Sequence, residues 1–309
     1  MAPMVDLDAA ADFLRARYGH PVADVTHVGQ GEWSVAYAFR LDGDDLVVRF
    51  GPQADDFQKD AFCAGFATAA LPIPAVLEVG EALGGYHAIS RRVFGGFIDD
   101  LDASGFRAAL PSLFATFDAA RAADLSATRG FGMFGASGNA PYPTWRDALL
   151  AAPVLSERMP DWRERLAASA GGTAAFDRGM AALGALVEFC PEERHLLHGD
   201  TIHRNVFIGA NRVTGIIDWG CGLFGDFLYD VAYMSFWWPW YDQWREIDLV
   251  EEARRHYAGQ SADVAHFDER VAAYQLRTGL DAMIYAAWLG RAPELAWNTR
   301  RILSIINAR

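Results

Sequence analysis

The chain has 309 residues, a length that suits one large domain or two modest ones with a buried core. Hydrophobic residues make up 52% and charged residues 22%, which is an ordinary globular composition and excludes a largely disordered chain. The formal net charge of −13 is opposite in sign to that of a general nucleic-acid-binding protein, so we expect no nucleic-acid partner. An acidic surface attracts a cationic small molecule, although charge alone favours a merely solvated surface.

The sequence has neither an apolar run long enough for a transmembrane helix nor a basic-then-apolar signal pattern at its start. We therefore expect a cytoplasmic monomer with no membrane partner. Its three cysteines, Cys63, Cys190 and Cys221, are widely spaced and form no C-x-x-C pair, which predicts small buried side chains instead of disulfides or a zinc site.

The N-terminal part is predicted to be a small antiparallel β-sheet with one or two helices. Apolar and small residues alternate or cluster in strand-like runs, which glycine-rich turns and a Leu-Pro-Ile-Pro segment separate. The predicted elements are, in chain order, a helix at 5–18, a strand from residue 26, strands at 34–39 and 46–50, a helix at about 55–69, and strands at 75–80 and 86–90.

The remainder is predicted to be mostly helical, with one hairpin. The predicted helices span 104–124, 144–151, 157–168, 173–190, 226–237, 242–257, 264–289 and 293–307. Two short strands, 205–208 and 213–218, are joined by the turn at 209–212. The fold class is therefore α+β, with a small β-rich lobe over residues 1–92 and a larger helical lobe over 93–309. The cleft between two such lobes is a natural ligand site.

The segment from His198 to Asp218 carries the strongest functional signal. Asp200 follows His198 by two positions, Asn205 follows five residues later, and Asp218 closes the second strand of the hairpin. Phosphoryl transfer needs a carboxylate to orient or deprotonate the attacking hydroxyl, and oxygen ligands for magnesium on the nucleotide phosphates. Asp200 is the predicted base, and Asn205 and Asp218 are the predicted Mg²⁺ ligands. The alternative, a coincidental loop with a capping Asp and a surface Asn, does not account for the flanking hairpin.

This spacing resembles the H-R-D-x-x-x-x-N loop of protein kinases, followed by their metal-binding Asp. Gly199 replaces the Arg, and Asp218 lies in Ile-Asp-Trp instead of Asp-Phe-Gly, a form that resembles the aminoglycoside phosphotransferase family. The resemblance implies a protein-kinase-like two-lobed fold. We interpret His198 as a structural residue that bonds loop backbone. His203 inside the loop either approaches substrate or is simply exposed, and both alternatives stay open.

A possible nucleotide loop, Gly29-Gln30-Gly31-Glu32-Trp33-Ser34, lies between two predicted strands. Glycines let backbone N–H groups approach phosphates closely, so Gly29, Gly31 and Ser34 are predicted nucleotide contacts. The pattern G-x-G-x-x-S lacks the third glycine of kinases, and a plain hairpin turn explains it equally well. Its position ahead of the other elements is what supports the nucleotide interpretation.

A basic residue for the nucleotide phosphates is expected on the third strand. Arg49 lies where kinases carry Lys, and Asp60 on the following helix is its predicted partner. The alternative is an exposed Arg on an edge strand and a solvated Asp. The backbone near Ile89–Arg91, where the lobes should join, is predicted to bond the purine of the nucleotide, with GTP as the alternative to ATP.

The region after the hairpin is the predicted substrate side. Asp226 suits a helix N-cap and Asp230 is expected to orient the catalytic loop, so structural roles are favoured for both. Trp237 and Trp240 belong to an aromatic cluster that either stacks on sugar faces or forms core under the helices. His203, Asp226, Trp237 and Trp240 are the candidate substrate residues. Asp242, Glu246, Glu251 and Glu252 form either an acidic rim or a solvated helix face.

Nearly the whole chain resembles the hygromycin B branch of the aminoglycoside phosphotransferase family. The matching stretches include residues 69–74, 89–92, 122–126, 130–135, 144–147, 236–240 and 279–281. The resemblance implies magnesium-dependent transfer of the ATP γ-phosphate to a hydroxyl of hygromycin B, which confers antibiotic resistance. It also implies the three roles given above to Asp200, Asn205 and Asp218, and antibiotic contacts by Trp237 and Trp240.

Two segments depart from that branch. Residues 201–204 replace a smaller and more polar loop, where Arg204 adds a positive charge, and Gly220-Cys221-Gly222 lacks an acidic residue. Two other hypotheses therefore stay open. One is a kinase of another sugar, amino alcohol or natural product. The other is a catalytically inactive nucleotide- or ligand-binding protein, which loss of the base or of a metal ligand would favour.

Overall fold

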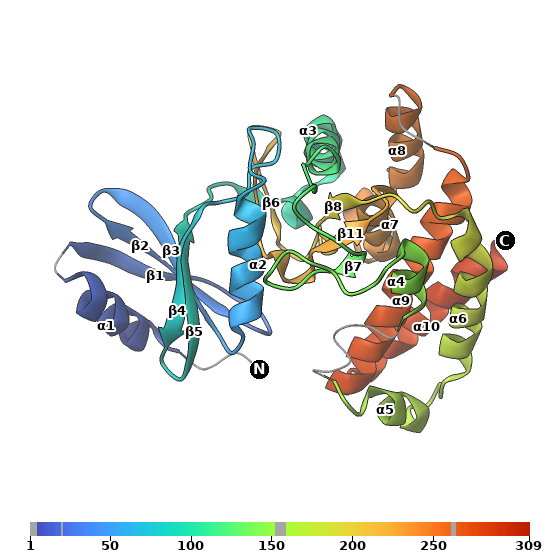
Figure 1. Ribbon diagram of the computed structural model, residues 1–309, viewed down its shortest axis with the longest axis horizontal. Helices are drawn as coiled ribbons and strands as arrows, with labels where there is room; N and C mark the ends of the chain where they lie inside the picture. Colours follow the sequence, from blue (N-terminus) through green and yellow to red (C-terminus); the bar gives the residue numbers. More distant parts are fainter. Residues whose placement is uncertain (1–4, 20, 152–158, 261–263) are drawn as a thin grey trace.

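The computed structural model describes residues 5–19, 21–151, 159–260 and 264–309. These residues form the predicted α+β architecture, with an antiparallel sheet lobe at one end and a mainly helical lobe at the other (Figure 1). Helix α2 (Ala54–Ala64) lies between the five-stranded sheet and the helical lobe in this view. The lobe boundary between residues 92 and 93 stays a prediction.

The N-terminal lobe contains a five-stranded sheet in the order β1-β2-β3-β5-β4, with every neighbouring pair antiparallel. Alternating side chains of the strands pack with α1 into a core of their own. The turn between β2 and β3 uses left-handed backbone at Asp42 and Gly43, as the Asp-Gly-Asp sequence predicts. Its elements are α1 (Leu7–Tyr18), β1 (Val22–Gln30), β2 (Val35–Leu41), β3 (Asp44–Gly51), α2 (Ala54–Ala64), β4 (Val76–Ala82) and β5 (Gly85–Arg91).

Helix α2 is shorter than the sequence predicts, because it ends at Ala64 instead of continuing to about residue 69. After it, the backbone N–H of Thr68 donates to the carbonyl of Leu71, and its hydroxyl accepts from the Leu71 N–H. This turn buries Leu71 and Ile73 in the core of the helical lobe. The chain therefore leaves the helix early, because the turn lets these two apolar side chains be buried.

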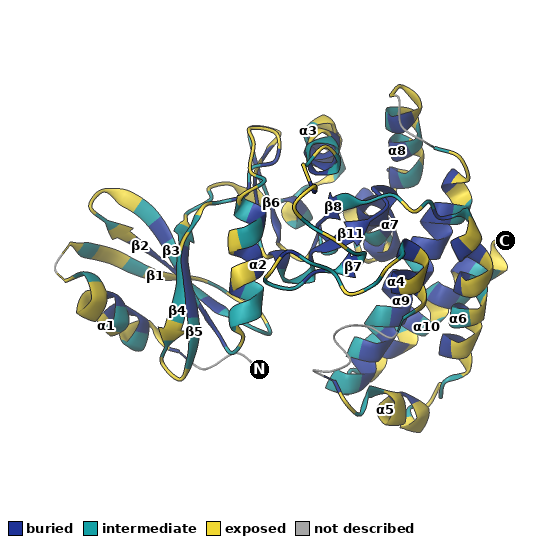
Figure 2. Ribbon diagram, viewed as in Figure 1, coloured by how far each residue is buried: buried dark blue, intermediate teal, exposed yellow. Residues whose placement is uncertain are grey.

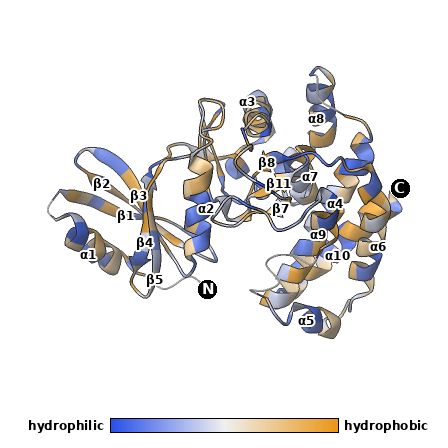
Figure 3. Cartoon of the chain, in the orientation of Figure 1, coloured by the Kyte–Doolittle hydropathy of each residue, from blue (hydrophilic) through white to orange (hydrophobic). Residues whose placement is uncertain are grey.

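The helical lobe is built around α7 and α9, whose residues are mostly buried (Figure 2). Its helices are α3 (Ala103–Arg121), α4 (Trp145–Leu150), α5 (Trp162–Ala168), α6 (Ala174–Leu186), α7 (Leu228–Trp237), α8 (Leu249–Ala258), α9 (Phe267–Leu289) and α10 (Ala292–Asn307). Polar and apolar residues are interspersed along α6 and α9 (Figure 3). None of the helices in the described part of the chain has the length and apolarity of a membrane span.

Two further helix predictions differ from the structure. The helix predicted for 242–257 is a 3₁₀ turn at Asp242–Trp244 followed by α8, because Asp248 caps a new helix by accepting from the Glu251 N–H at 3.0 Å. The helix predicted for 157–168 begins only at Trp162, and residues 157 and 158 lie outside the described residues.

Two three-stranded sheets support the catalytic segment, in the orders β10-β9-β6 and β7-β11-β8. The hairpin predicted from sequence is formed by β9 (Val206–Gly209) and β10 (Arg212–Ile216). The sequence analysis missed β6 (Gly96–Phe97), β7 (Gly132–Met133), β8 (His195–Leu197) and β11 (Leu223–Gly225), because two or three residues show no periodicity. Pairing of β6 with β9 places the segment after the N-terminal lobe beside the catalytic hairpin.

Candidate active site

The catalytic loop runs from β8 to β9, and a buried carboxylate holds its beginning. Asp230 of α7 accepts from the backbone N–H groups of His198 and Gly199, at 2.9 and 2.8 Å. His198 donates from Nε2 to the Ile217 carbonyl at 2.9 Å, and its Nδ1 accepts from the Asp200 N–H at 3.2 Å. These contacts confirm that Asp230 orients the loop and that His198 is structural.

Gly199 adopts a conformation that only glycine fits well. Its φ is +74°, and a Cβ there would lie 2.7 Å from both the Cys221 carbonyl oxygen and Leu223 Cδ2. We expect Gly199→Ala to destabilise the fold by about 1–3 kcal/mol and to reduce turnover more than it reduces nucleotide affinity. Thermal unfolding and steady-state kinetics measure both effects, with Gly184→Ala as the control, since nothing lies near its Cβ position. Unchanged stability and turnover in Gly199→Ala would contradict this account.

Asp200 lies at the centre of a short hydrogen-bond network. Its Oδ1 accepts from the Tyr233 hydroxyl at 2.7 Å and lies 2.8 Å from His203 Nδ1. Burial raises the pKa of Asp200, but His203 and the Tyr233 hydroxyl outweigh burial and bring that pKa below its usual range. Burial lowers the pKa of His203, while Asp200 raises it above its usual value. Asp200 is thus an ionised carboxylate at neutral pH, able to accept a hydroxyl hydrogen bond.

Asn205 and Asp218 present oxygen atoms beside Asp200. Asn205 donates from Nδ2 to the Asp200 carbonyl at 2.9 Å, which leaves its side-chain oxygen free to accept or to bind a cation. Asp218 lies two residues beyond the end of β10, in left-handed backbone with φ +63°, so it does not belong to the predicted strand. Its side chain is 51% exposed, and Arg49 Nη1 lies 3.9 Å from its Oδ1.

This donor set fits Mg²⁺, which prefers few protein oxygens together with phosphate and water oxygens. Within the described ranges, no group of three or more His, Cys, Asp or Glu residues could hold a metal ion by itself. Asn205 and Asp218 would therefore bind Mg²⁺ jointly with the nucleotide phosphates.

We expect Asp218→Ala to weaken magnesium-nucleotide binding about tenfold or more, which corresponds to about 1.4 kcal/mol or more. The side chain removed would be a metal ligand. Calorimetric titration of ATP with and without Mg²⁺ measures the effect. The metal-free titration is the control, and it should show a smaller difference between variant and wild type. Equal affinities in the presence of Mg²⁺ would contradict the assignment.

Arg49 and Asp60 form an ion pair, as predicted, between β3 and α2. Their side chains are only 15% and 7% exposed, so the alternative of an exposed Arg and a solvated Asp does not hold. Asp60 also accepts from the Trp219 N–H at 2.7 Å, next to Asp218. The neighbouring Lys59 donates to the Gly220 carbonyl at 3.0 Å. Helix α2 therefore fixes the backbone that follows Asp218.

The glycine loop contacts the far lobe as well as lining the cleft. The Gly31 N–H donates to the Ser34 carbonyl at 2.9 Å, closing a tight turn. Between them, Glu32 forms an ion pair with Arg291, and the Trp33 ring stacks on Trp288 with centroids 6.1 Å apart. Sequence reasoning missed this contact because its partners lie more than 250 residues apart in the chain.

A cavity of about 580 Å³ separates the lobes and gathers most of the predicted site residues. Those that line it are Gly31, Ser34, Arg49, Asp200, His203, Asn205, Asp218, Trp237 and Trp240. The predicted residues that do not line it are Gly29, Asp60, Ile89, Arg91 and Asp226. Gly29 pairs with Ala36 within the sheet.

The predicted purine contact near Ile89–Arg91 does not reach this cavity. Strand β5 lies between β3 and β4, so both of its edges are already paired. The Arg91 N–H donates to the Ala75 carbonyl at 2.9 Å. Ile89 and Arg91 thus lie outside the cavity lining, and their contact with the purine stays a prediction.

Asp226 also has a structural role. It is fully buried and accepts from Arg270 Nε and Nη2 at 2.8 and 2.7 Å and from the Tyr274 hydroxyl at 2.6 Å. The residue at the N-cap of α7 is Phe227, and Asp226 accepts from the Leu228 N–H only at 3.3 Å. Asp226 is thus shielded from the cavity by its partners and is not a substrate contact.

One wall of the cavity is aromatic and includes Trp237 and Trp240. Trp237 is 8% exposed and stacks on Trp297 with an interplanar angle of 5°, while Trp240 is 42% exposed. Trp237 is therefore mostly a core residue, which is one of the two predicted alternatives. Trp240 presents a face to solvent, as the other alternative, stacking on a sugar face, requires. Trp237 Nε1 and Asn298 Oδ1 are buried and have no hydrogen-bond partner among the residues that the structure describes.

Helices α9 and α10 contribute carboxylates that sequence reasoning did not single out. Asp281 and Glu294 line the same cavity, together with Asn298 and Tyr285. The spacing of Glu294 and Asn298 places both on one face of α10, a signal that sequence could have supplied. Burial raises the pKa of Asp281, and Arg277, whose Nη2 lies 3.0 Å from Asp281 Oδ1, opposes that rise.

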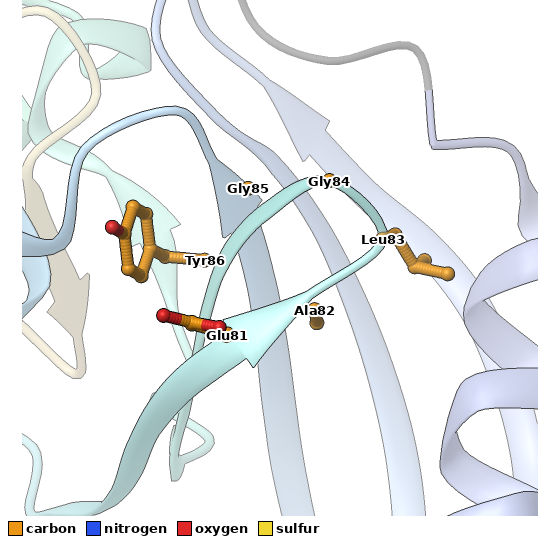
Figure 4. Close-up of a pocket in the computed structure, with 6 residues that line it drawn as sticks. All are labelled: Glu81, Ala82, Leu83, Gly84, Gly85 and Tyr86. Atoms are coloured by element: carbon orange, nitrogen blue, oxygen red, sulfur yellow. The ribbon is translucent and has the colours of Figure 1, made fainter.

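A second hollow, of about 410 Å³, lies at the turn between β4 and β5. It is formed by the six consecutive residues Glu81–Tyr86, with Leu83 at the tip of the turn (Figure 4). None of the predicted site residues lies there. The cavity between the lobes is therefore the candidate active site.

Comparisons with known proteins identify similar chains over nearly the full length. Residues 28–273 match the model of the "Phosphotransferase enzyme family". The chain is 35% identical to an Escherichia coli "Hygromycin-B 4-O-kinase" over 93% of its own length and 82% of that protein.

Solved structures show the same similarity. The crystal structure of aminoglycoside phosphotransferase APH(4)-Ia is 34% identical, with a TM-score of 0.84, over 98% of this chain and 99% of that one. A thermostable mutant of the same enzyme, in a ternary complex with AMP-PNP and hygromycin B, has a TM-score of 0.83 over 97% and 98%. Aminoglycoside 2′-phosphotransferase-IIIa, at 15% identity, shares the fold with a TM-score of 0.65 over 97% and 98% of the two chains.

Proposed function

Because this chain belongs to the phosphotransferase enzyme family, we propose that it transfers the γ-phosphate of ATP to a hydroxyl of hygromycin B and so confers resistance. The observation that carries this proposal is the position of the Asp200 carboxylate. It lies in the cavity between the lobes, which Asn205, Asp218, Arg49 and the aromatic wall also line. A hydroxyl bound there would meet an ionised acceptor.

On the nucleotide side, Arg49 would bind phosphate oxygens while Asp60 holds its guanidinium. Asn205 and Asp218 would hold Mg²⁺, which when bound neutralises charge on the transferred phosphoryl group. Gly31 and Ser34 would place the glycine loop over the phosphates. Asp200 would orient the attacking hydroxyl and accept its proton, while Tyr233 and His203 fix the carboxylate.

On the substrate side, the aromatic wall supports a cationic ligand, because aromatic faces attract ammonium groups. Trp237 and Trp240 line the cavity together with Asp281 and Glu294, whose carboxylates pair with Arg277 and Arg291. Arg204 does not oppose this, because its guanidinium pairs with Asp100 at 2.9 Å and lies over the Phe97 ring, outside the cavity lining. The positive charge noted in the sequence is thus neutralised locally.

A kinase of another hydroxylated natural product remains the second candidate, favoured by the size of the residues in the loop at 201–204. An aminoglycoside panel with Mg²⁺ and either ATP or GTP, read by mass spectrometry, separates the hypotheses. We expect hygromycin B to gain one phosphoryl group with the highest kcat/KM. Product from another compound alone would support the second candidate. Nucleotide binding without any turnover would support a ligand-binding protein.

A further inference from the structure

The end of the catalytic loop has an unusual backbone. His203 and Arg204 are consecutive residues with φ of +62° and +70°. Left-handed backbone is disfavoured for any residue that carries a Cβ, and two such residues in succession need support from outside the loop. The residue that follows them is the proposed metal ligand Asn205, and three residues before His203 lies the proposed base Asp200. The geometry of this short segment therefore sets the distance between the two functional groups.

One carboxylate outside the loop supplies that support. Asp99, in the 3₁₀ turn Ile98–Asp100, accepts from the His203 N–H on Oδ1 at 2.9 Å and from the Arg204 N–H on Oδ2 at 3.0 Å. Each oxygen thus holds one of the two left-handed residues. Hydrogen bonds to a charged acceptor are stronger than those between neutral groups, so this contact is well suited to hold the disfavoured conformation.

Asp99 also connects the catalytic loop to the segment that follows Trp240 of the aromatic wall. The Tyr241 hydroxyl donates to Asp99 Oδ1 at 2.8 Å, and Gln243 Nε2 donates to the Asp99 carbonyl at 3.1 Å. Tyr241 directly follows Trp240 in the chain, and Gln243 comes two residues after Tyr241. The aromatic segment and the catalytic loop are therefore held by the same residue.

We propose that Asp99 is a positioning residue for the phosphoryl transfer, because it fixes the end of the catalytic loop as Asp230 fixes its beginning. Asp99 touches none of the reacting atoms. It acts through His203, whose ring contacts Asp200, and through the backbone that carries Asn205. This inference rests on the proposed function, since it assigns Asp99 a role in that reaction.

The test compares Asp99→Ala with the matched variant Asp100→Ala. Asp100 is the adjacent, exposed carboxylate, which contacts only the Arg204 side chain in the described residues. We expect Asp99→Ala to reduce kcat by about tenfold to a hundredfold, because small misplacements of reacting groups are costly, while the nucleotide KM changes less than about twofold. Asp100→Ala should stay within about twofold of wild type in both constants. Wild-type kcat in Asp99→Ala, or equal losses in the two variants, would overturn the proposal.

A rescue experiment separates positioning from general stability. Glycine adopts positive φ freely, so Arg204→Gly should restore part of the kcat lost in Asp99→Ala. A variant that merely unfolds more easily would not be rescued by an added glycine, and no rescue would count against positioning. If Asp99→Ala does not fold, Asp99→Asn keeps one acceptor oxygen and should show a smaller loss of kcat. Wild-type kcat in Asp99→Asn together with unaltered loop exchange would then overturn the proposal.

Hydrogen–deuterium exchange gives a readout that does not depend on the substrate. Peptides covering residues 198–205 should exchange faster in Asp99→Ala than in Asp100→Ala, while those covering α7 should not change. If wild-type protein fails to phosphorylate hygromycin B, the proposed function fails and exchange still tests the loop. If wild-type protein is active and the loop exchanges equally in both variants, only the positioning role fails.

Discussion

Asp200→Asn should reduce kcat by about 10²–10⁴-fold, the usual contribution of a positioned acid or base, while nucleotide affinity stays within about twofold of wild type. The amide keeps the shape of the side chain but removes its charge and its ability to take a proton. Because Asn205 bonds the Asp200 backbone carbonyl and not its side chain, the metal-binding side should stay in place.

Steady-state kinetics and a calorimetric ATP titration measure the two quantities separately. Asp100→Asn is the matched control, since this carboxylate is exposed and does not line the cavity. Turnover of Asp200→Asn at the wild-type rate would remove Asp200 from the catalytic role. A parallel loss of nucleotide affinity would instead indicate that the substitution disturbs the whole site.

Asp226→Ala should lower the free energy of unfolding by about 3–5 kcal/mol, because it removes the buried carboxylate that accepts two hydrogen bonds from the Arg270 guanidinium. Arg270 is 1% exposed, and both hydrogen bonds it makes to Asp226 lie in the core of the helical lobe. The Tyr274 hydroxyl loses its acceptor as well. This substitution removes more buried polar contacts than any change to the cavity residues discussed above.

Urea unfolding measures this change. Asp268→Ala is the control, because Asp268 pairs with Arg254 on the surface with 67% of its side chain exposed, and such pairs contribute about 0–1 kcal/mol. A loss below about 1 kcal/mol for Asp226→Ala would contradict the structural role given to Asp226.

The parts of the molecule that sequence predicts well are those whose signal is local. Asp200, Asn205 and Asp218 lie within 19 residues of one another, and the hairpin that carries them has a turn sequence with its own preference. The strands of the N-terminal sheet follow from alternation of apolar and polar residues. Arg49 and Asp60, though on different elements, are close in sequence, and their pairing is confirmed.

Contacts between distant segments could not be predicted in the same way. Asp226 is a residue type that often caps a helix. Only the fold shows that Arg270, 44 residues further along the chain, lies beside it. Asp99 is one of three acidic residues in a short segment, and nothing local distinguishes it from Asp100. The position of Arg91 inside the sheet depends on the order of all five strands.

The most direct test of the proposed function compares the products that wild-type protein and Asp200→Asn form from ATP, Mg²⁺ and hygromycin B. Phosphorus NMR of the reaction mixture identifies where the γ-phosphate goes. We expect one phosphate ester on hygromycin B for each ADP formed, with ester formation nearly abolished in the variant. Release of inorganic phosphate without an ester, or equal ester formation by both proteins, would contradict this expectation.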